Sequence, residues 1–263
     1  MSTAADQIIA ELRVENDYLA GVVAGLSESD LRRRSGAVDW TIAQVLSHLG
    51  SGAVIALAAL QAALTGQDDR GEGFNQLVWD RWNAMSPTEQ AAEYLVANEA
   101  LVTRYDAIDA DARASCRIDL GFPPAPVDLA TAAGLRLNEF TLHLWDVDVI
   151  FDVNATLAPS AAGLLGGPLA LLFGSVGHAD ASEARGVIAV ETTDPTQSFG
   201  FTIADSVFLG ETPTAADSVL QLPTEAWIRL VTGRLSPEHT PAAVQITGGS
   251  INLADLRLVF PGF

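Results

Sequence analysis

The sequence predicts a fold that is mainly α followed by α+β: a helical N-terminal domain over residues 1–157 and a smaller α+β domain over residues 158–263. Long stretches of helical apolar periodicity fill most of the first part. Short alternating segments typical of strands appear only after about residue 185. A chain of 263 residues with 49% hydrophobic composition can also bury two modest cores, one in each domain.

The first domain is predicted to be a bundle of four long helices joined by loops. Asp39 or Thr41 can cap the second helix, and Ser86 followed by Pro87 and Glu89 is a strong start signal for the third. Loops are predicted over residues 66–75, which are polar, and 121–126, which are rich in proline. The predicted helices span residues 3–25, 39–64, 86–109 and 129–151.

The second domain is predicted to mix helices and strands. A helix over 160–177 comes first, and Pro223 is tolerated within a mostly helical segment over 214–232. A last short helix covers 251–259. The predicted strands span residues 186–191, 198–203, 206–209 and 243–247.

Composition excludes several classes of function. The formal net charge of −19 repels nucleic acids and anionic membrane surfaces. The apolar stretch 161–177 is shorter than the roughly 20 residues of a membrane span, so we interpret it as a buried helix. All fourteen basic residues are arginine, which excludes a Schiff-base, pyridoxal phosphate or Walker lysine. The partner that remains is a small-molecule substrate, and the oligomeric state stays open.

The single cysteine, Cys116, excludes an intramolecular disulfide and fits a reducing compartment. The N-terminus has no basic-then-apolar signal pattern. We therefore expect a cytoplasmic protein. No neighbouring residue clearly lowers the pKa of Cys116, so it is a poor candidate for a catalytic thiol.

Three residues form a candidate metal site. Glu139 and His143 are four residues apart on one predicted helix, so both project from the same face. His48 lies on the second helix, which can face the fourth in a bundle. Two histidines and one carboxylate leave open positions on a metal ion, as in catalytic sites. The same pattern also describes a structural hydrogen bond, a solvated pair or a core histidine.

The run from Trp40 to Leu49 and the segment Glu139–Asp146 resemble the mycothiol-dependent maleylpyruvate isomerase family, within the wider DinB-like metalloenzymes. In that family a tryptophan-led helix supplies one histidine and a Glu-x-x-x-His helix supplies two more ligands. The resemblance implies that His48, Glu139 and His143 bind a divalent metal, with zinc the expected ion. It covers nearly the whole chain, because the second half resembles the family's C-terminal domain, which is similar to sterol-carrier folds.

The resemblance implies a mycothiol-type thiol as cofactor. A divalent ion lowers the pKa of a bound thiol or water and creates a nucleophile at neutral pH. Thiolate addition allows rotation about a double bond, and elimination restores it; other members transfer the thiol to electrophiles. A small electrophilic or acidic substrate is expected. The family also suggests an arginine from the second domain, with Arg234 the first candidate as a catalytic residue and Arg229 the second. A surface arginine at a helix end is the alternative.

Two other functions remain open at this stage. A metalloenzyme without a thiol would support hydrolysis or cyclisation, and an apolar-ligand binding protein would carry a vestigial metal site. Asp146 and Asp148 are either solvated helix residues or carboxylates that orient a ligand histidine. His178 and His239 lie in predicted loops and are not expected to be ligands.

Overall fold

The computed structural model describes residues 3–262, and the chain divides into two compact units, Met1–Asp152 and Val153–Phe263. The first is helical and the second combines helices with a mixed sheet, which confirms the predicted fold class. The predicted boundary after residue 157 lies a few residues further along the chain. The carbonyl oxygen of Val153 lies 3.1 Å from Nδ1 of His239, a hydrogen bond within the second unit.

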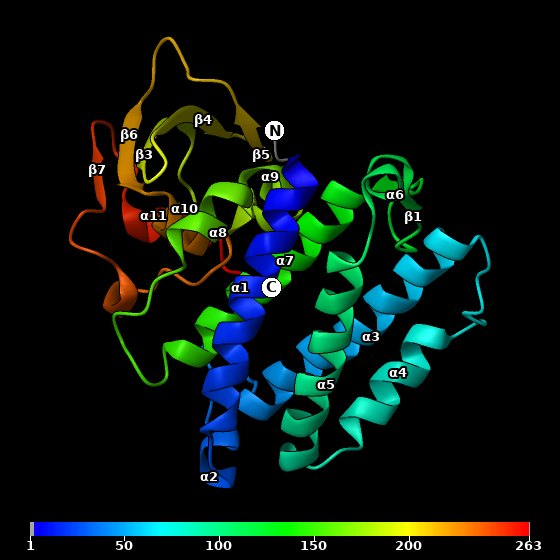
Figure 1. The fold of residues 1–263 in the computed structure, drawn as a ribbon. Coiled ribbons are helices and arrows are strands. Elements are labelled where there is room, and N and C mark those ends of the chain that lie inside the picture. Colours follow the sequence, from blue (N-terminus) through cyan, green and yellow to red (C-terminus); the bar gives the residue numbers. More distant parts are fainter. Residues whose placement is uncertain (1–2, 263) are drawn as a thin grey trace. The chain divides into compact units, whose positions relative to one another are not determined.

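Four long helices make up most of the first unit, as Figure 1 shows. Each begins at a residue whose side-chain oxygen accepts a hydrogen bond from a backbone N–H three residues further on, and these residues are Thr3, Thr41, Ser86 and Asp128. The helices are α1 (Ala4–Ala24), α3 (Ile42–Thr65), α5 (Pro87–Asp106) and α7 (Leu129–Asp148). These caps explain why the sequence predicted the helix starts so closely.

The connections in the first unit hold more regular structure than the sequence predicted. Helix α4 (Phe74–Asn83) begins at the end of the predicted loop 66–75 and covers residues for which the sequence predicted no element, and Trp82 is its buried residue. A two-stranded antiparallel ladder pairs β1 (Arg117–Ile118) with β2 (Val127–Asp128) before α7. Two short helices, α2 (Glu28–Leu31) and α6 (Ala110–Ser115), complete the unit.

Helix α3 is the central helix of the bundle and packs against α5, α4 and α7. By length and composition it is apolar enough to cross a membrane, but 56% of its most apolar window is buried inside the protein. Gly50 belongs to this packing, because a Cβ there would overlap the ring of Trp82. These properties are those of a core helix.

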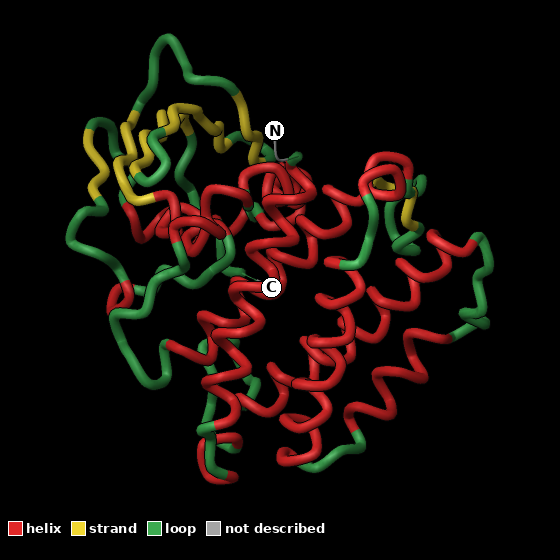
Figure 2. Tube along the Cα trace, in the orientation of Figure 1, coloured by secondary structure: helices red, strands yellow, loops and turns green. Residues whose placement is uncertain are grey.

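The second unit is built on a five-stranded sheet in the order β5-β4-β3-β6-β7. Strand β3 pairs antiparallel with β4 and parallel with β6. The strands are β3 (Gly186–Thr193), β4 (Gln197–Ile203), β5 (Val207–Gly210), β6 (Ser218–Pro223) and β7 (Gln245–Thr247), drawn yellow in Figure 2. The helices are α8 (Pro159–Leu164), α9 (Gly166–Val176), α10 (Thr224–Val231) and α11 (Leu253–Val259), with 3-10 turns at 179–181 and 237–239.

Two predictions for this unit were wrong in part. Within the predicted helix 214–232, Ser218–Pro223 form the strand β6, and only Thr224–Val231 is helical. More buried and less buried residues alternate along β6, which is the two-residue period of a strand and not that of a helix. Pro223 ends the strand, and the helix follows it. The helix predicted over 160–177 is two helices, α8 and α9, divided at Leu165, and it is not a buried helix, because only Leu169, Phe173 and Val176 of α9 are buried.

Candidate metal centre

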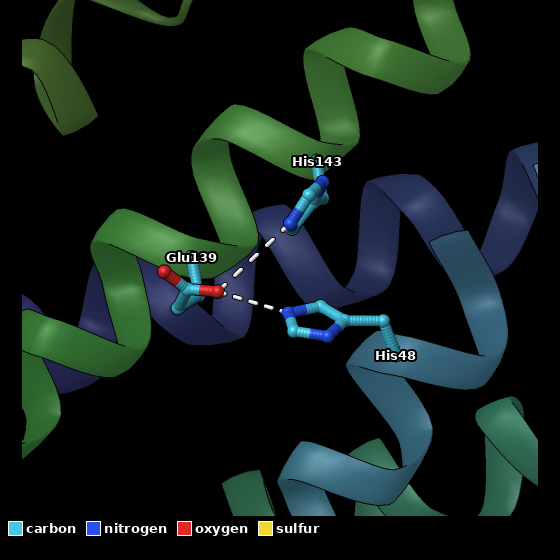
Figure 3. A group of neighbouring side chains, drawn as sticks. All are labelled: His48, Glu139 and His143. Carbon is cyan, nitrogen blue, oxygen red and sulfur yellow. Dashed lines mark hydrogen bonds and ion pairs between the residues drawn. The ribbon is translucent and has the colours of Figure 1, made fainter. Parts of the chain in front are cut away.

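The candidate centre is formed by helices α3 and α7. The side chain of Thr41 caps α3, and Gln44 completes a capping box with it, so the helix begins one residue after Trp40. His48 lies near the end of the second turn. Glu139 and His143 are one turn apart on α7, and Figure 3 shows both side chains directed toward His48.

The donor atoms of these three residues all lie within 4.8 Å of one another. His48 Nε2 is 2.9 Å from Glu139 Oε2, and His143 Nε2 is 3.9 Å from the same oxygen. His143 is largely buried, whereas the side chains of His48 and Glu139 are 37% and 41% exposed. The group is therefore held by the bundle and is open to a small molecule on one side.

The donor set fits a divalent metal. Three ligands of a tetrahedral zinc ion, each about 2.1 Å from it, lie roughly 3.4 Å from one another. The distances of the two imidazole nitrogens to Glu139 Oε2, 2.9 and 3.9 Å, lie on either side of that spacing, and all the donor atoms lie within 4.8 Å of one another, so side-chain rotations can bring them to it. Nitrogen and oxygen donors suit zinc and also nickel, cobalt or iron. Across residues 3–262 no other group of histidine, cysteine and carboxylate donors is assembled this way.

A buried carboxylate orients His143. Its Nδ1 lies 2.8 Å from Oδ2 of Asp146, whose side chain is fully buried. If Nδ1 donates to this carboxylate, Nε2 keeps its lone pair and faces Glu139. Gly36 supports the arrangement: its N–H donates to the Asp146 carbonyl at 2.7 Å, and a Cβ at Gly36 would crowd the Asp146 side chain.

An aromatic ring lines the centre. The ring of Trp40 stacks on His143, with centroids 5.7 Å apart, and lies tilted against His48 at 5.2 Å. The two imidazoles meet edge to face at 4.8 Å. Trp40 therefore limits how both histidines can rotate and shields one side of the centre from water.

Electrostatics keep Glu139 ionised. Burial by itself raises its pKa, but the hydrogen bond with His48 and the charges of His143, His48 and Arg136 outweigh burial and lower the pKa to about 2. A carboxylate with this pKa is charged at neutral pH, which is the form that binds a cation.

Arg136 connects the helices around the centre. Its buried guanidinium donates through Nη2 to the Leu49 carbonyl and to Oδ1 of Asn98, both at 2.7 Å. Leu49 follows His48 on α3, Asn98 lies on α5, and Arg136 itself lies one turn before Glu139 on α7. A Cβ at Gly52 would meet Nη1 of Arg136. Arg136 thus fixes the part of α3 that carries His48 to the part of α7 that carries Glu139.

The other predicted residues have different environments. Arg229 is buried and forms a bidentate pair with Glu225, with Nε–Oε2 at 2.7 Å and Nη2–Oε1 at 3.0 Å, so its charge is already used within the fold. Arg234 is half-buried and donates through Nη1 to the Thr232 carbonyl. It belongs to the second unit, and its catalytic role stays a prediction. Burial raises the pKa of the Cys116 thiol, which is unfavourable for a nucleophile.

Sequence reasoning missed Arg136 and left Asp146 undecided. An aspartate at i+3 from a ligand histidine is the signal for Asp146, but its burial depends on tertiary structure. The signal for Arg136 is a charge on a mostly apolar helix, one turn before Glu139. The glycine at position 52 of α3 is the matching signal, because it leaves room for the Arg136 side chain. Asp148, the other candidate, is half-buried and hydrogen-bonds with Tyr18 rather than with His143.

Comparisons with known proteins agree with the geometry. Residues 12–148, which contain all three donors, match the family described as mycothiol maleylpyruvate isomerase N-terminal domain. No relative is found among curated protein sequences. A crystal structure of the mycothiol-dependent maleylpyruvate isomerase has the same fold, with a TM-score of 0.67 at 12% identity over 96% of this chain and 98% of that one.

The structure of a histidine-to-alanine mutant of that isomerase matches equally well, with a TM-score of 0.66 at 12% identity over 96% of this chain and 98% of that chain. At this identity the two structures establish the fold. The likeness of the second half to sterol-carrier folds stays a prediction. The matched family is an enzyme family, and it covers more than half of the sequence. The chain belongs to the mycothiol maleylpyruvate isomerase N-terminal domain family.

Proposed function

We propose that this protein is a metal-dependent, mycothiol-dependent isomerase that acts on a small, unsaturated, acidic substrate of the maleylpyruvate type. The observation that carries the proposal is the convergence of His48, Glu139 and His143 within 4.8 Å, inside the segment that matches the family. These three residues would hold the metal, with zinc the expected ion. A bound divalent ion lowers the pKa of a thiol or water at its open position and supplies a nucleophile at neutral pH.

The chain's own residues prepare the site for this chemistry. Glu139 is ionised at neutral pH, and a hydrogen bond donated by Nδ1 of His143 to Asp146 would leave Nε2 with the lone pair that binds a metal. Trp40 covers one side and excludes water from it. The protein offers no good nucleophile of its own, because it has no lysine and Cys116 is buried. An external thiol would therefore supply the nucleophile.

The first experiment measures metal content and thiol dependence together. We expect the purified protein to carry about one zinc per chain, and His143→Ala to lose it, while His178→Ala keeps it as the control. Turnover of maleylpyruvate should require mycothiol. A full metal load in His143→Ala would contradict the ligand assignment. Turnover without thiol would favour a thiol-free metalloenzyme instead.

A second experiment tests whether the thiol reaches the metal. In the cobalt-substituted protein, mycothiol should add a sulfur-to-metal charge-transfer band, because a coordinated thiol is deprotonated. Trp40→Phe keeps an apolar ring and should keep the band. An unchanged spectrum at millimolar thiol, together with thiol-independent activity, would reject thiol coordination.

Arg234 is proposed to bind a carboxylate of the substrate, since the guanidinium fork binds carboxylates bidentately. Arg234→Lys should raise KM or lower kcat at constant metal content. Arg185→Lys, at an exposed arginine of the same unit, is the control. Identical kinetics for the two variants would remove Arg234 from the proposed site.

A further inference from the structure

Arg136 carries a positive charge into the interior of the bundle, and the residue is only 7% exposed. Its Nη2 donates to two neutral oxygens, the carbonyl of Leu49 and Oδ1 of Asn98, both at 2.7 Å. Within residues 3–262, its buried Nε has no hydrogen-bond partner. The guanidinium carbon lies 5.8 Å from the centre of the uncharged Phe140 ring. The groups that contact this guanidinium therefore do not neutralise its charge.

The charge of Arg136 persists at neutral pH. Burial lowers the pKa of Arg136, and among the neighbouring charges the carboxylate of Glu139 opposes this effect most. A guanidinium has so high an intrinsic pKa that it stays protonated even when it is buried. Glu139 lies one turn further along α7 and belongs to the candidate metal centre. The charge of Arg136 therefore acts on that centre through the interior of the bundle.

The side chains of α3 and α7 determine the charge of the centre. His48 and His143 bind a metal as neutral imidazoles. Glu139 and Asp146 are carboxylates, and together they would offset the two charges of a divalent ion. Arg136 raises the charge of this group by one positive unit. In a partly desolvated site, that unit favours a ligand with a negative charge over a neutral ligand.

We propose that Arg136 makes the metal centre selective for anionic ligands at the positions that the three protein donors leave open. The inference rests on the proposed function, because it requires His48, Glu139 and His143 to hold a divalent ion. It deepens that function by naming the charge of what binds there, which is a thiolate or a carboxylate and not a neutral thiol, alcohol or amine. The link that Arg136 makes between α3 and α7 is a separate role, since it depends on hydrogen bonds.

Asn98 offers a way to cancel the charge while Arg136 stays in place. An aspartate at this position has nearly the same shape, and its carboxylate can accept the same hydrogen bond from Nη2 of Arg136. The bond that Nδ2 of Asn98 donates to the Tyr94 carbonyl, one turn away on α5, is lost. Asn98→Asp therefore pairs the charge and keeps the link to Leu49. Arg136→Met removes the charge and the link together.

The experiment measures anion binding to the cobalt-substituted full chain by visible absorption, without turnover. Azide is the anionic probe and pyrazole the neutral one. We expect azide to bind the wild type, and Asn98→Asp and Arg136→Met to bind it about tenfold more weakly. A unit charge roughly 10 Å away, at an effective dielectric constant of about 20, has an effect of this size. The affinity for pyrazole should change by less than about twofold, because pyrazole carries no net charge.

Arg81→Met is the matched control, because it removes the same charge from a side chain that is 62% exposed. It should bind both probes like the wild type. Arg136→Lys keeps the charge and should bind azide within about threefold of the wild type. Competition with a chelator shows whether each variant keeps its cobalt, and circular dichroism shows whether it folds. If Arg136→Met does not fold, Asn98→Asp decides, because it leaves the arginine and its link to α3 in place.

Several results would overturn the inference. An unchanged wild-type spectrum with azide would mean that no anion reaches the metal. Wild-type azide affinity in both variants would mean that the charge of Arg136 does not act on the centre. Equal losses for azide and pyrazole, or a loss in Arg136→Met that Asn98→Asp does not share, would mean that Arg136 acts through geometry alone. Failure of the wild type to take up cobalt is distinguishable from these, because it would overturn the metal centre and the proposed function together with this inference.

Discussion

The buried ionisable side chains around the metal centre distinguish the interior of the helical bundle, whereas a cluster of aromatic rings in contact with one another distinguishes the interior of the second unit. Glu15, Arg136 and Asp146 are buried in the bundle, and each has a hydrogen-bond partner there. In the second unit Trp227 and Phe260 belong to a cluster of rings. The ionic pair buried there consists of Arg229 and Glu225, whose guanidinium and carboxylate form two hydrogen bonds.

The difference separates two uses of a protein interior. Buried polar groups cost desolvation and add little net stability, but they fix which atoms face each other. The bundle uses them to hold ligand-bearing helices in register, through Arg136 on Leu49 and Asp146 on His143. Aromatic rings stabilise by the area they bury and place few demands on a neighbour's chemistry. An interior of this kind can therefore leave a hollow without leaving a polar group unsatisfied.

The largest expected effect is in the aromatic interior. Trp227→Ala removes a buried ring that contacts four others, so it should lower the free energy of unfolding by about 3–5 kcal/mol. Phe208→Ala, at an exposed ring of the same unit, should cost at most about 1 kcal/mol. Urea unfolding followed by circular dichroism measures both. Equal losses would mean that the ring cluster does not carry the stability of this unit.

A pH-dependent effect is expected in the bundle. Burial raises the pKa of Glu15 to about 8, against the hydrogen bond from Thr141 and with a small contribution from the charge of Glu11. Between about pH 4.5 and pH 8, the Glu15 carboxyl is therefore protonated in the folded state and ionised in the unfolded state. Stability is full below about pH 4.5 and falls as the pH rises toward 8.

Glu15→Gln removes this titration and keeps an oxygen that can accept from Thr141. We expect the variant to be more stable than the wild type at pH 8.5 by about 2–4 kcal/mol, and similar to it at pH 5. Thermal unfolding across this range provides the measurement. Glu72→Gln, at an exposed residue, should follow the wild-type profile. A Glu15→Gln profile parallel to the wild type would show that Glu15 does not titrate in this range.

The next effect concerns metal affinity. Asp146→Asn weakens the hydrogen bond that orients His143, and loss of such a partner typically lowers metal affinity about 10- to 100-fold. Asp148→Asn is the control two residues further along α7, since Asp148 bonds with Tyr18. Competition with a chelator of known affinity measures both variants. If they bind metal equally well, Asp146 has no orienting role.

The sequence predicted the parts of the fold that local chemistry determines. The four long helices begin at side-chain caps such as Thr41 and Ser86, and a cap is readable within a few residues. Strand β6 was not predicted, because its preference for a strand depends on pairing with β3 and β7. Helix α4 was missed because its residues are polar on average, and nothing in the sequence indicates the close approach of Trp82 to Gly50 of α3.

In the candidate site, too, some residues could be predicted from the sequence and others depend on tertiary contacts. Residue type and helical spacing made His48, Glu139 and His143 candidates, the family resemblance implied that they bind a metal, and the structure brings their donor atoms together. Whether Asp146 is solvated or buried was undecidable, since that depends on the loop at Gly36, far away in sequence. Arg136 acts through the Leu49 carbonyl, a backbone atom that leaves no trace in the sequence.

The smallest expected effect applies one substitution to both units. Gly21 and Gly174 each lie in the last turn of a helix, have helical backbone angles, and have no atom within 4 Å of an added Cβ. Alanine reduces the freedom of the unfolded chain, so each Gly→Ala change should stabilise its unit by about 0.5 kcal/mol. Gly50→Ala should destabilise, because its Cβ meets Trp82. Equal gains at Gly21 and Gly174, measured by urea unfolding, would show that helix propensity acts alike in both units. A loss at Gly174 alone would mean that the surface near α9 is covered in solution.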